Sequence, residues 1–268
     1  MNKNIIIAGP CALDSSEINF EIASTLKAIC TELNMEYVFK GSFDKANRLS
    51  IESGRGKGLE ASIPLYQEIK QKLNLGITSD VHSIEQVELI EPYIDIIQIP
   101  AFLARQTDLI IESARTGKIV NIKKAQFMSW SDVILAAEKA RTAGSKEVWI
   151  TERGTMFGYK DLIVDYRNFF ELLRFDFKLF FDATHSVQKP GGDIKSSAGE
   201  RKYVPMLIAG AAAAGVENLF FETHPNPSNS VSDGKNMVPL DKVKQVLFDY
   251  SSLAKYRRNN ELTRLDEI

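Results

Sequence analysis

The chain has 268 residues, in which 33 Lys and Arg face 35 Asp and Glu for a formal net charge of −2. A chain with this charge balance lacks the excess positive charge that attracts proteins to nucleic acid or to an anionic membrane. The longest apolar stretch, at 206–216, is shorter than the roughly 20 residues of a membrane span. The N-terminal apolar run is too short for a signal peptide. The two cysteines form no disulfide framework, so we expect a cytoplasmic protein.

Eight short apolar runs, bounded by Gly, Pro and polar residues, recur along the chain. Several are apolar at consecutive positions, which is typical of strands buried on both faces. The expected strands cover residues 4–8, 36–40, 77–79, 94–99, 119–122, 147–150, 178–181 and 217–221.

Helical patterns lie between these runs. Apolar residues recur at helical spacing over 18–33, and Asp14 with Glu17 resembles a capping box at the start of that helix. A second helix is expected to follow Ser129, with Gly144 as its stop signal.

Eight strands, each followed by a connection that is wholly or partly helical, predict a parallel α/β fold. Eight repeats in a chain of this length favour a closed (β/α)8 TIM barrel over an open doubly wound sheet. We therefore expect one barrel domain spanning 1–268. Three long connections, 41–59, 186–203 and 224–240, are expected to be irregular and to carry function.

Titratable side chains gather at the predicted carboxyl ends of the strands, where the active sites of such barrels lie. All three histidines, His82, His185 and His224, directly follow predicted strands. Asp80 and Gln98 occupy the corresponding ends of two neighbouring strands. We therefore expect the functional site at this end of the barrel.

Six cationic side chains also follow different predicted strands. Arg binds phosphates and carboxylates through two parallel hydrogen bonds and Lys acts as a point charge, so their convergence indicates a substrate with several negative charges. The alternative for any one of them is a solvated surface charge. The absence of Gly-x-Gly-x-x-Gly and phosphate-loop motifs counts against nucleotides. The six are Lys40, Lys45, Arg48, Arg105, Lys123 and Arg153.

A possible metal site is formed by Cys11, His185, Glu222 and Asp233. A thiolate, an imidazole and two carboxylates suit a divalent transition ion such as Fe²⁺, Zn²⁺, Mn²⁺ or Co²⁺. No local spacing motif supports the set, and a lone cysteine is more often a buried core residue. That second interpretation fits Cys30, which lies on the apolar face of the first expected helix.

Eight segments at these strand ends share a pattern with one enzyme family. They are IAGPC (7–11), FKGSFDKANR (39–48), TSDVH (78–82), IQIPAFLARQTDL (97–109), VNIKKAQF (120–127), ITERGTMFGY (150–159), FDATHSVQKPGG (181–192) and ETHPNPSNSVSDG (222–234). Together they resemble the 3-deoxy-D-manno-octulosonate 8-phosphate synthases over nearly the full chain. FDKANR and PAFLARQTD are specific to that family among its barrel relatives.

The resemblance implies condensation of phosphoenolpyruvate with D-arabinose 5-phosphate and water. The products are 3-deoxy-D-manno-octulosonate 8-phosphate, which feeds the inner core of bacterial lipopolysaccharide, and inorganic phosphate. The resemblance further implies that Lys40 and Lys45 hold the phosphoenolpyruvate carboxylate, whereas Lys123 and Arg153 hold its phosphate.

For the sugar, the resemblance implies that Asn47 and Arg48 bind the phosphate. Arg105 joins them from a neighbouring subunit, which implies a homo-oligomer, normally a tetramer. The expected substrate-binding set also includes Ser50, Gln98, Ala101 and His224. The expected catalytic residues are Lys45, Asp80, His82, His185 and Asp233. The candidates for proton transfer or for orienting the aldehyde are Asp80, His82 and His224.

The family has a metal-requiring class with Cys in the Gly-Pro-Cys position and a metal-free class with Asn. Cys11 therefore indicates the metal-requiring class, in which the ligands correspond to Cys11, His185, Glu222 and Asp233. One position departs from the pattern, because Leu49 stands where the family usually has the first serine of Asn-Arg-Ser-Ser. Losing that hydroxyl predicts sugar-phosphate binding weaker by about 0.5–1.5 kcal/mol.

Two alternatives compete with this interpretation. The first is the sister condensation with erythrose 4-phosphate, whose enzymes typically carry Lys-Pro-Arg-Thr where this chain has KANR at 45–48. The second is a non-catalytic barrel that only binds anions. The intact set of four possible metal ligands counts against the second alternative.

Overall fold

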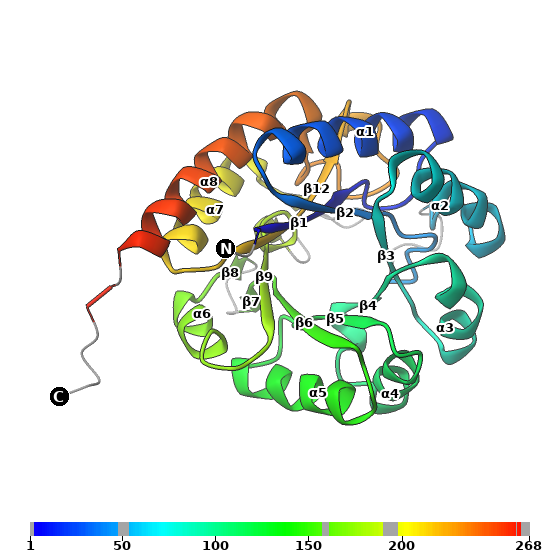
Figure 1. The fold of residues 1–268 in the computed structure, drawn as a ribbon, viewed down its shortest axis with the longest axis horizontal. Helices are drawn as coiled ribbons and strands as arrows, with labels where there is room; N and C mark the ends of the chain where they lie inside the picture. Colours follow the sequence, from blue (N-terminus) through cyan, green and yellow to red (C-terminus); the bar gives the residue numbers. More distant parts are fainter. Residues whose placement is uncertain (1–2, 48–53, 157–160, 190–197, 261, 264–268) are drawn as a thin grey trace.

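A closed ring of eight parallel strands forms the centre of the computed structural model, which describes residues 3–47, 54–156, 161–189, 198–260 and 262–263. Strand β1 pairs with β2 on one side and with β12 on the other, and this second pairing closes the ring (Figure 1). The (β/α)8 barrel and all eight expected strands are thereby confirmed. The ring strands are β1 Ile5–Gly9, β2 Glu36–Lys40, β3 Gly76–Asp80, β4 Ile96–Ile99, β5 Ile119–Lys123, β6 Glu147–Glu152, β9 Lys178–Asp182 and β12 Asn218–His224.

Helices surround this ring on its outer face (Figure 1). None of the described helices is long and apolar enough to cross a membrane. The α-helices are α1 Ser16–Glu32, α2 Leu59–Leu73, α3 Ile84–Ile90, α4 Thr107–Arg115, α5 Trp130–Thr142, α6 Tyr166–Leu172, α7 Val204–Ala213 and α8 Val243–Asn259.

The helix starts differ in one detail from the sequence prediction. The hydroxyl of Ser15 caps α1 by accepting a hydrogen bond from the Ile18 backbone N–H at 3.3 Å. The expected capping role of Asp14 is therefore wrong, because its carboxylate accepts from the backbone N–H of Ser15 instead. Helix α5 begins directly after Ser129, as expected, and a capping box forms there between Ser129 and Asp132.

Along each ring strand, side chains point alternately into the barrel and toward the helices, as the two-residue period of a β-strand requires. The inward positions at the amino-terminal end pack as a separate apolar cluster, whereas the intervening positions face the helices. This inner cluster consists of Ile5, Ile7, Val38, Ile96, Trp149, Phe180 and Phe220. The same alternation carries on to the carboxyl ends, where the inward side chains become polar and charged.

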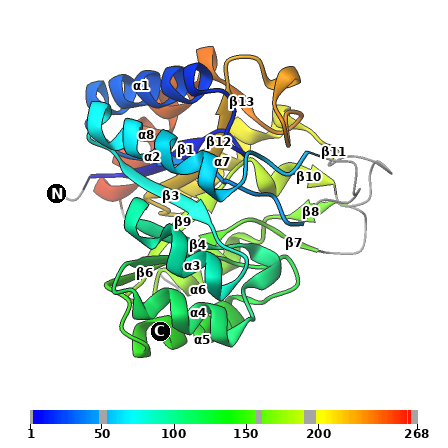
Figure 2. The same cartoon turned by 90° about the vertical axis from the view of Figure 1, so that its right-hand side faces the viewer.

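Short paired strands cover this carboxyl end (Figure 2). The connections 186–203 and 224–240, expected to be irregular, contain such strands, and part of 41–59 lies outside the described residues. The short strands are β7 Thr155–Met156, β8 Leu162–Ile163, β10 Gln188–Lys189, β11 Ala198–Gly199 and β13 Val238–Pro239. Because β13 extends the sheet from β12, it fixes the end of the loop that carries Asp233.

Candidate metal and anion site

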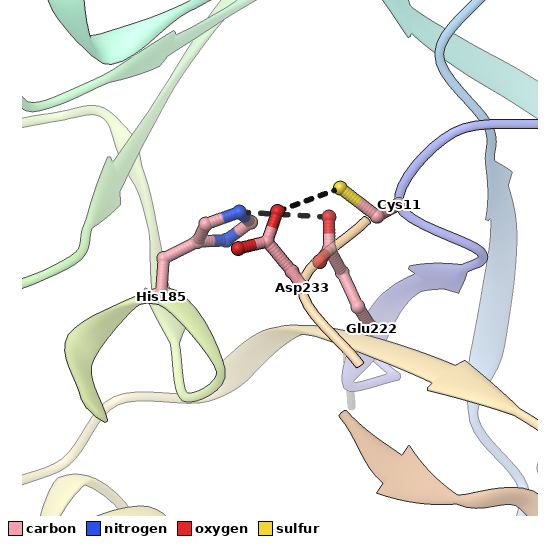
Figure 3. A group of neighbouring side chains, drawn as sticks. All are labelled: Cys11, His185, Glu222 and Asp233. Carbon is pink, nitrogen blue, oxygen red and sulfur yellow. Dashed lines mark hydrogen bonds and ion pairs between the residues drawn. The ribbon is translucent and has the colours of Figure 1, made fainter. Parts of the chain in front are cut away.

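Four potential metal ligands converge at the carboxyl end of the barrel. One ligand atom from each of Cys11, His185, Glu222 and Asp233 lies within 4.8 Å of all the others. Figure 3 shows the four side chains turned toward a common point, although they come from three segments distant in sequence. Within the described residues this is the group with metal-binding geometry. The ring closure between β1 and β12 is what brings Cys11 beside Glu222.

The donor atoms fit a divalent cation. Glu222 Oε2 is buried and has no hydrogen-bond partner among the described residues, and leaving a buried oxygen unpaired is costly. Burial first, and then the charge of Glu222, raise the pKa of the Cys11 thiol well above its usual value. A divalent cation would reverse both effects, because it favours the thiolate and provides the partner that Glu222 lacks.

Asp182 holds His185 in an orientation that would suit metal binding. Its carboxylate contacts His185 Nδ1 at 2.7 Å and the His185 backbone N–H at 2.9 Å. When Nδ1 donates to this carboxylate, the lone pair of Nε2 faces Glu222 Oε1, 3.6 Å away. Burial alone would raise the pKa of Asp182, but His185 and Lys123 hold it well below its usual value.

Asp233 is held by a tightly packed loop. Its backbone has φ +54°, a left-handed conformation that Asp tolerates better than most residues. One carboxylate oxygen accepts from the Cys11 thiol at 3.2 Å and from the Ser232 hydroxyl at 2.6 Å. The other oxygen accepts from the amide of Gln188 at 2.9 Å. Asp233 is therefore oriented before any ion binds.

Four buried cations surround these ligands, each held by a partner on the protein. Lys40 Nζ donates to the Cys11 carbonyl at 2.6 Å and to Glu222 at 3.2 Å. Polar side chains also hold the other three cations: Lys45 bonds to Asp80 at 3.2 Å, Lys123 to Asp182, and Arg153 to Gln188 at 2.5 Å. Arg153 Nη1 is buried without a partner among the described residues, so it can still receive an anion.

A line of buried polar side chains crosses four neighbouring strands below the cations. Thr151 donates to Asn121 at 2.8 Å, and Asn121 donates to Gln98 at 3.0 Å. Gln98 then donates to Asp80, which also accepts from Ser42 at 2.6 Å. The line orients the Gln98 amide with its nitrogen toward Asp80 and so fixes the carboxylate that contacts Lys45.

The two remaining histidines have protein partners. His82 Nδ1 lies 3.1 Å from Gln86 Oε1. The buried His224 accepts from the Asn226 backbone N–H at 2.9 Å, and its Nε2 lies 3.3 Å from Asp14. Neither histidine belongs to the four-ligand group.

The sequence-predicted residues for the sugar lie farther out. Asn47 is exposed, Ala101 is half-buried at the start of a 3-10 turn, and Arg105 is exposed on the loop after β4. Arg48 and Ser50 lie outside the described residues, as does Leu49.

Glu152 does not orient Arg153, although an ion pair between these adjacent residues is plausible from sequence. Consecutive strand residues point to opposite faces, so Glu152 faces outward. There its carboxylate accepts from the Gly154 backbone N–H at 2.6 Å and lies 3.5 Å from Lys124. Arg153 turns inward to Gln188.

The sequence prediction misses one residue of the site and the role of another. Asp182 directly follows the strand expected at 178–181, so its place at the carboxyl end of the barrel is predicted, but its contact with His185 is not. Gln188 had no comparable signal, because its contacts with Arg153 and Asp233 join loops that are distant in sequence.

Comparison with known proteins identifies the family. A model described as the DAHP synthetase I family matches residues 1–256. The chain is 46% identical to the 2-dehydro-3-deoxyphosphooctonate aldolase of Fusobacterium nucleatum over 91% of this chain and 87% of that protein. It is 48% identical to the enzyme of that name from Rhodopseudomonas palustris over 94% of this chain and 89% of that protein.

The relatives of this name match the chain along most of its length and show that the barrel is an enzyme of the class that forms carbon–carbon bonds. The chain belongs to the DAHP synthetase I family and groups within it with the 2-dehydro-3-deoxyphosphooctonate aldolases.

Proposed function

We propose that the chain, acting as one catalytic domain, condenses phosphoenolpyruvate with D-arabinose 5-phosphate and water. The products are 3-deoxy-D-manno-octulosonate 8-phosphate and phosphate, for the lipopolysaccharide inner core. The observation that carries the proposal is the position of four buried cations around four potential metal ligands at one barrel mouth. Bringing two phosphorylated anions together is repulsive, and fixed cations offset that repulsion and hold the reacting carbons close.

Lys40 and Lys45 are proposed to bind the phosphoenolpyruvate carboxylate, and Lys123 and Arg153 its phosphate. The partners already described hold each cation in place, so little reorganisation is needed when the anion binds. Arg153 Nη1 has no partner among the described residues, which supports its assignment to the phosphate, because guanidinium groups bind phosphate oxygens through several N–H groups.

The divalent ion is proposed to be held by Cys11, His185, Glu222 and Asp233. When bound, it supplies either a lowered pKa or a fixed orientation for the water that adds at C2. Asp182 keeps His185 in the tautomer that leaves Nε2 free for the ion. His82, Asp80 and His224 are the proposed groups for proton transfer or for orienting the aldehyde.

The sugar phosphate is proposed to bind Asn47, Arg48 and Ser50, with Gln98, Ala101 and His224 completing the substrate site. Arg105 is proposed to join from a neighbouring subunit of a homotetramer. Its exposure on the loop after β4 supports this role, because an exposed guanidinium can reach another protomer.

The proposed phosphate site predicts a pH dependence. Burial lowers the pKa of Lys123 to about 8, so Lys123 loses its charge as the pH rises through that value. We expect kcat/KM for phosphoenolpyruvate to fall above about pH 8, because this ratio reports groups of the free enzyme. The Lys123→Arg variant stays charged, so this alkaline limb should move to higher pH. A limb at the same pH in both proteins would assign it to another group.

The direct test measures phosphate release from phosphoenolpyruvate with arabinose 5-phosphate before chelation, after chelation and after restoring Mn²⁺ or Fe²⁺. We expect release to disappear on chelation and to return with the metal. Release that persists in a sample proved metal-free would keep the condensation but remove the metal site. Turnover of erythrose 4-phosphate at a comparable rate would overturn the proposed sugar specificity. No release with either sugar would favour a barrel that only binds anions.

A further inference from the structure

Gln188 lies between the anion site and the metal ligands. Its amide oxygen accepts from Arg153 Nη2 at 2.5 Å, and its amide nitrogen donates to Asp233 at 2.9 Å. Only this amide orientation satisfies both neighbours, because the reverse would set the NH₂ group against the guanidinium and the carbonyl against the carboxylate. The amide thus joins a proposed phosphate-binding cation to a proposed metal ligand.

The backbone of Gln188 is held in place independently of its amide. It follows the 3-10 turn His185–Val187 and pairs with Gly199 in the antiparallel β10–β11 ladder. Asn236 packs so closely on Gly199 that a Cβ there would lie 1.5 Å from its Oδ1. Because the backbone N–H of Asn236 also bonds to the carbonyl of Asp233 at 2.8 Å, the loops that carry Gln188 and Asp233 are packed as one unit.

We propose that Gln188 is a positioning residue that couples anion binding at Arg153 to metal binding at Asp233. This inference rests on the proposed function, because it takes Arg153 as a phosphate ligand and Asp233 as a metal ligand. Gln188 holds one oxygen of Asp233, which leaves the other facing Cys11 at 3.2 Å. An anion on Arg153 Nη1, which no described residue contacts, fixes the guanidinium, and the guanidinium in turn fixes the amide of Gln188. Each ligand thereby orders groups that the other requires.

Direct attraction between the metal and the phosphate is a second source of coupling, and it needs no glutamine. The two sources differ in what happens when the amide is removed. Gln188→Met has similar length but cannot bond to both neighbours, so it removes the bridge and leaves all the charges in place. Coupling through the bridge should then fall, whereas coupling through space should persist.

The experiment measures Co²⁺ binding to the metal-free full-length protein from thiolate–cobalt absorbance, with and without saturating inorganic phosphate. In the native sequence we expect phosphate to tighten Co²⁺ binding about tenfold, within the usual range of coupling between sites. In Q188M the ratio of the two affinities should approach one. Phosphate binding measured with and without Co²⁺ should change by the same factor, because linkage is reciprocal.

Gln245→Met is the matched control. Gln245 is exposed on α8 and also bonds to a carboxylate, that of Asp249, at 2.8 Å. The substitution therefore removes the same kind of hydrogen bond away from the site. The ratio of Co²⁺ affinities with and without phosphate should be the same in Q245M as in the native sequence. Gln188→Asn, which keeps the amide but shortens its reach, serves as a second test if Q188M does not fold.

An equal phosphate effect in Q188M and the native sequence would overturn the inference in favour of direct attraction, as would the absence of any phosphate effect in the native sequence. Neither measurement requires turnover. If the condensation assay fails while the coupling is present and depends on Gln188, the proposed reaction is wrong and the coupling stands.

Discussion

Cys11→Ala is expected to lose the bound metal and to lower kcat/KM by about 10³-fold. A catalytic ion contributes several kcal/mol to stabilising a transition state, and each 1.36 kcal/mol corresponds to a factor of ten in rate. Cys11 offers the sulfur among the four converging ligands, and alanine offers none. Metal content per chain and steady-state turnover, measured on the same preparation, check the prediction.

Cys30→Ala is the control for this substitution. Cys30 is also buried, and burial raises the pKa of its thiol to about 12, which makes it unreactive. Its replacement should cost some packing energy in α1 but leave metal content and kcat/KM close to native. Full metal content and turnover in Cys11→Ala would show that the ion, if required, binds elsewhere.

Gly9→Ala is expected to have the largest effect on folding. A Cβ at Gly9 would lie 1.9 Å from the backbone carbonyl oxygen of Lys40 on the neighbouring strand. Neither strand can move freely because both belong to the closed ring. Inserting a methyl group into a well-packed core costs about 1–3 kcal/mol when side chains can adjust, and more is expected here because backbone must move. Denaturant-induced unfolding measures the loss.

Gly76→Ala tests the same substitution where space is available. Gly76 begins β3, and among the described residues a Cβ there would meet Val38 alone, at the ordinary contact distance of 3.8 Å. Its free energy of unfolding should stay within about 1 kcal/mol of the native value. A similar loss in both variants would mean that glycine flexibility, rather than the approach of Lys40, accounts for the effect.

The sequence predicts the barrel well because the ring strands are apolar runs flanked by Gly, Pro and polar residues. The bounds of the strands predicted at 36–40 and 178–181 agree with the structure within one residue. The boundary of α1 is less well predicted, because Asp14 and Ser15 are both good capping residues. Only the backbone conformation decides which of them caps the helix.

The sequence predicts which residues reach the candidate site better than it predicts which of them contact each other. Chemical type and position after a strand suffice to select Cys11 and His185 and also the cations, because parallel strands bring their carboxyl ends together. Partner choice is harder to predict. Glu152 follows Thr151 directly yet faces the opposite side of the sheet, and Gln188 gains its contacts only when two loops pack on each other.

The pairing of β1 with β12 also determines when, during synthesis, the proposed metal site can form. Cys11 is made early, whereas Glu222 and Asp233 come near the end of the chain, and β1 meets β12 only after both are present. A nascent chain that emerges N-terminus first therefore carries Cys11 as an unligated thiol through most of translation. Because an ion stabilises only the state that binds it, the metal should stabilise the completed ring and give no help to any shorter intermediate.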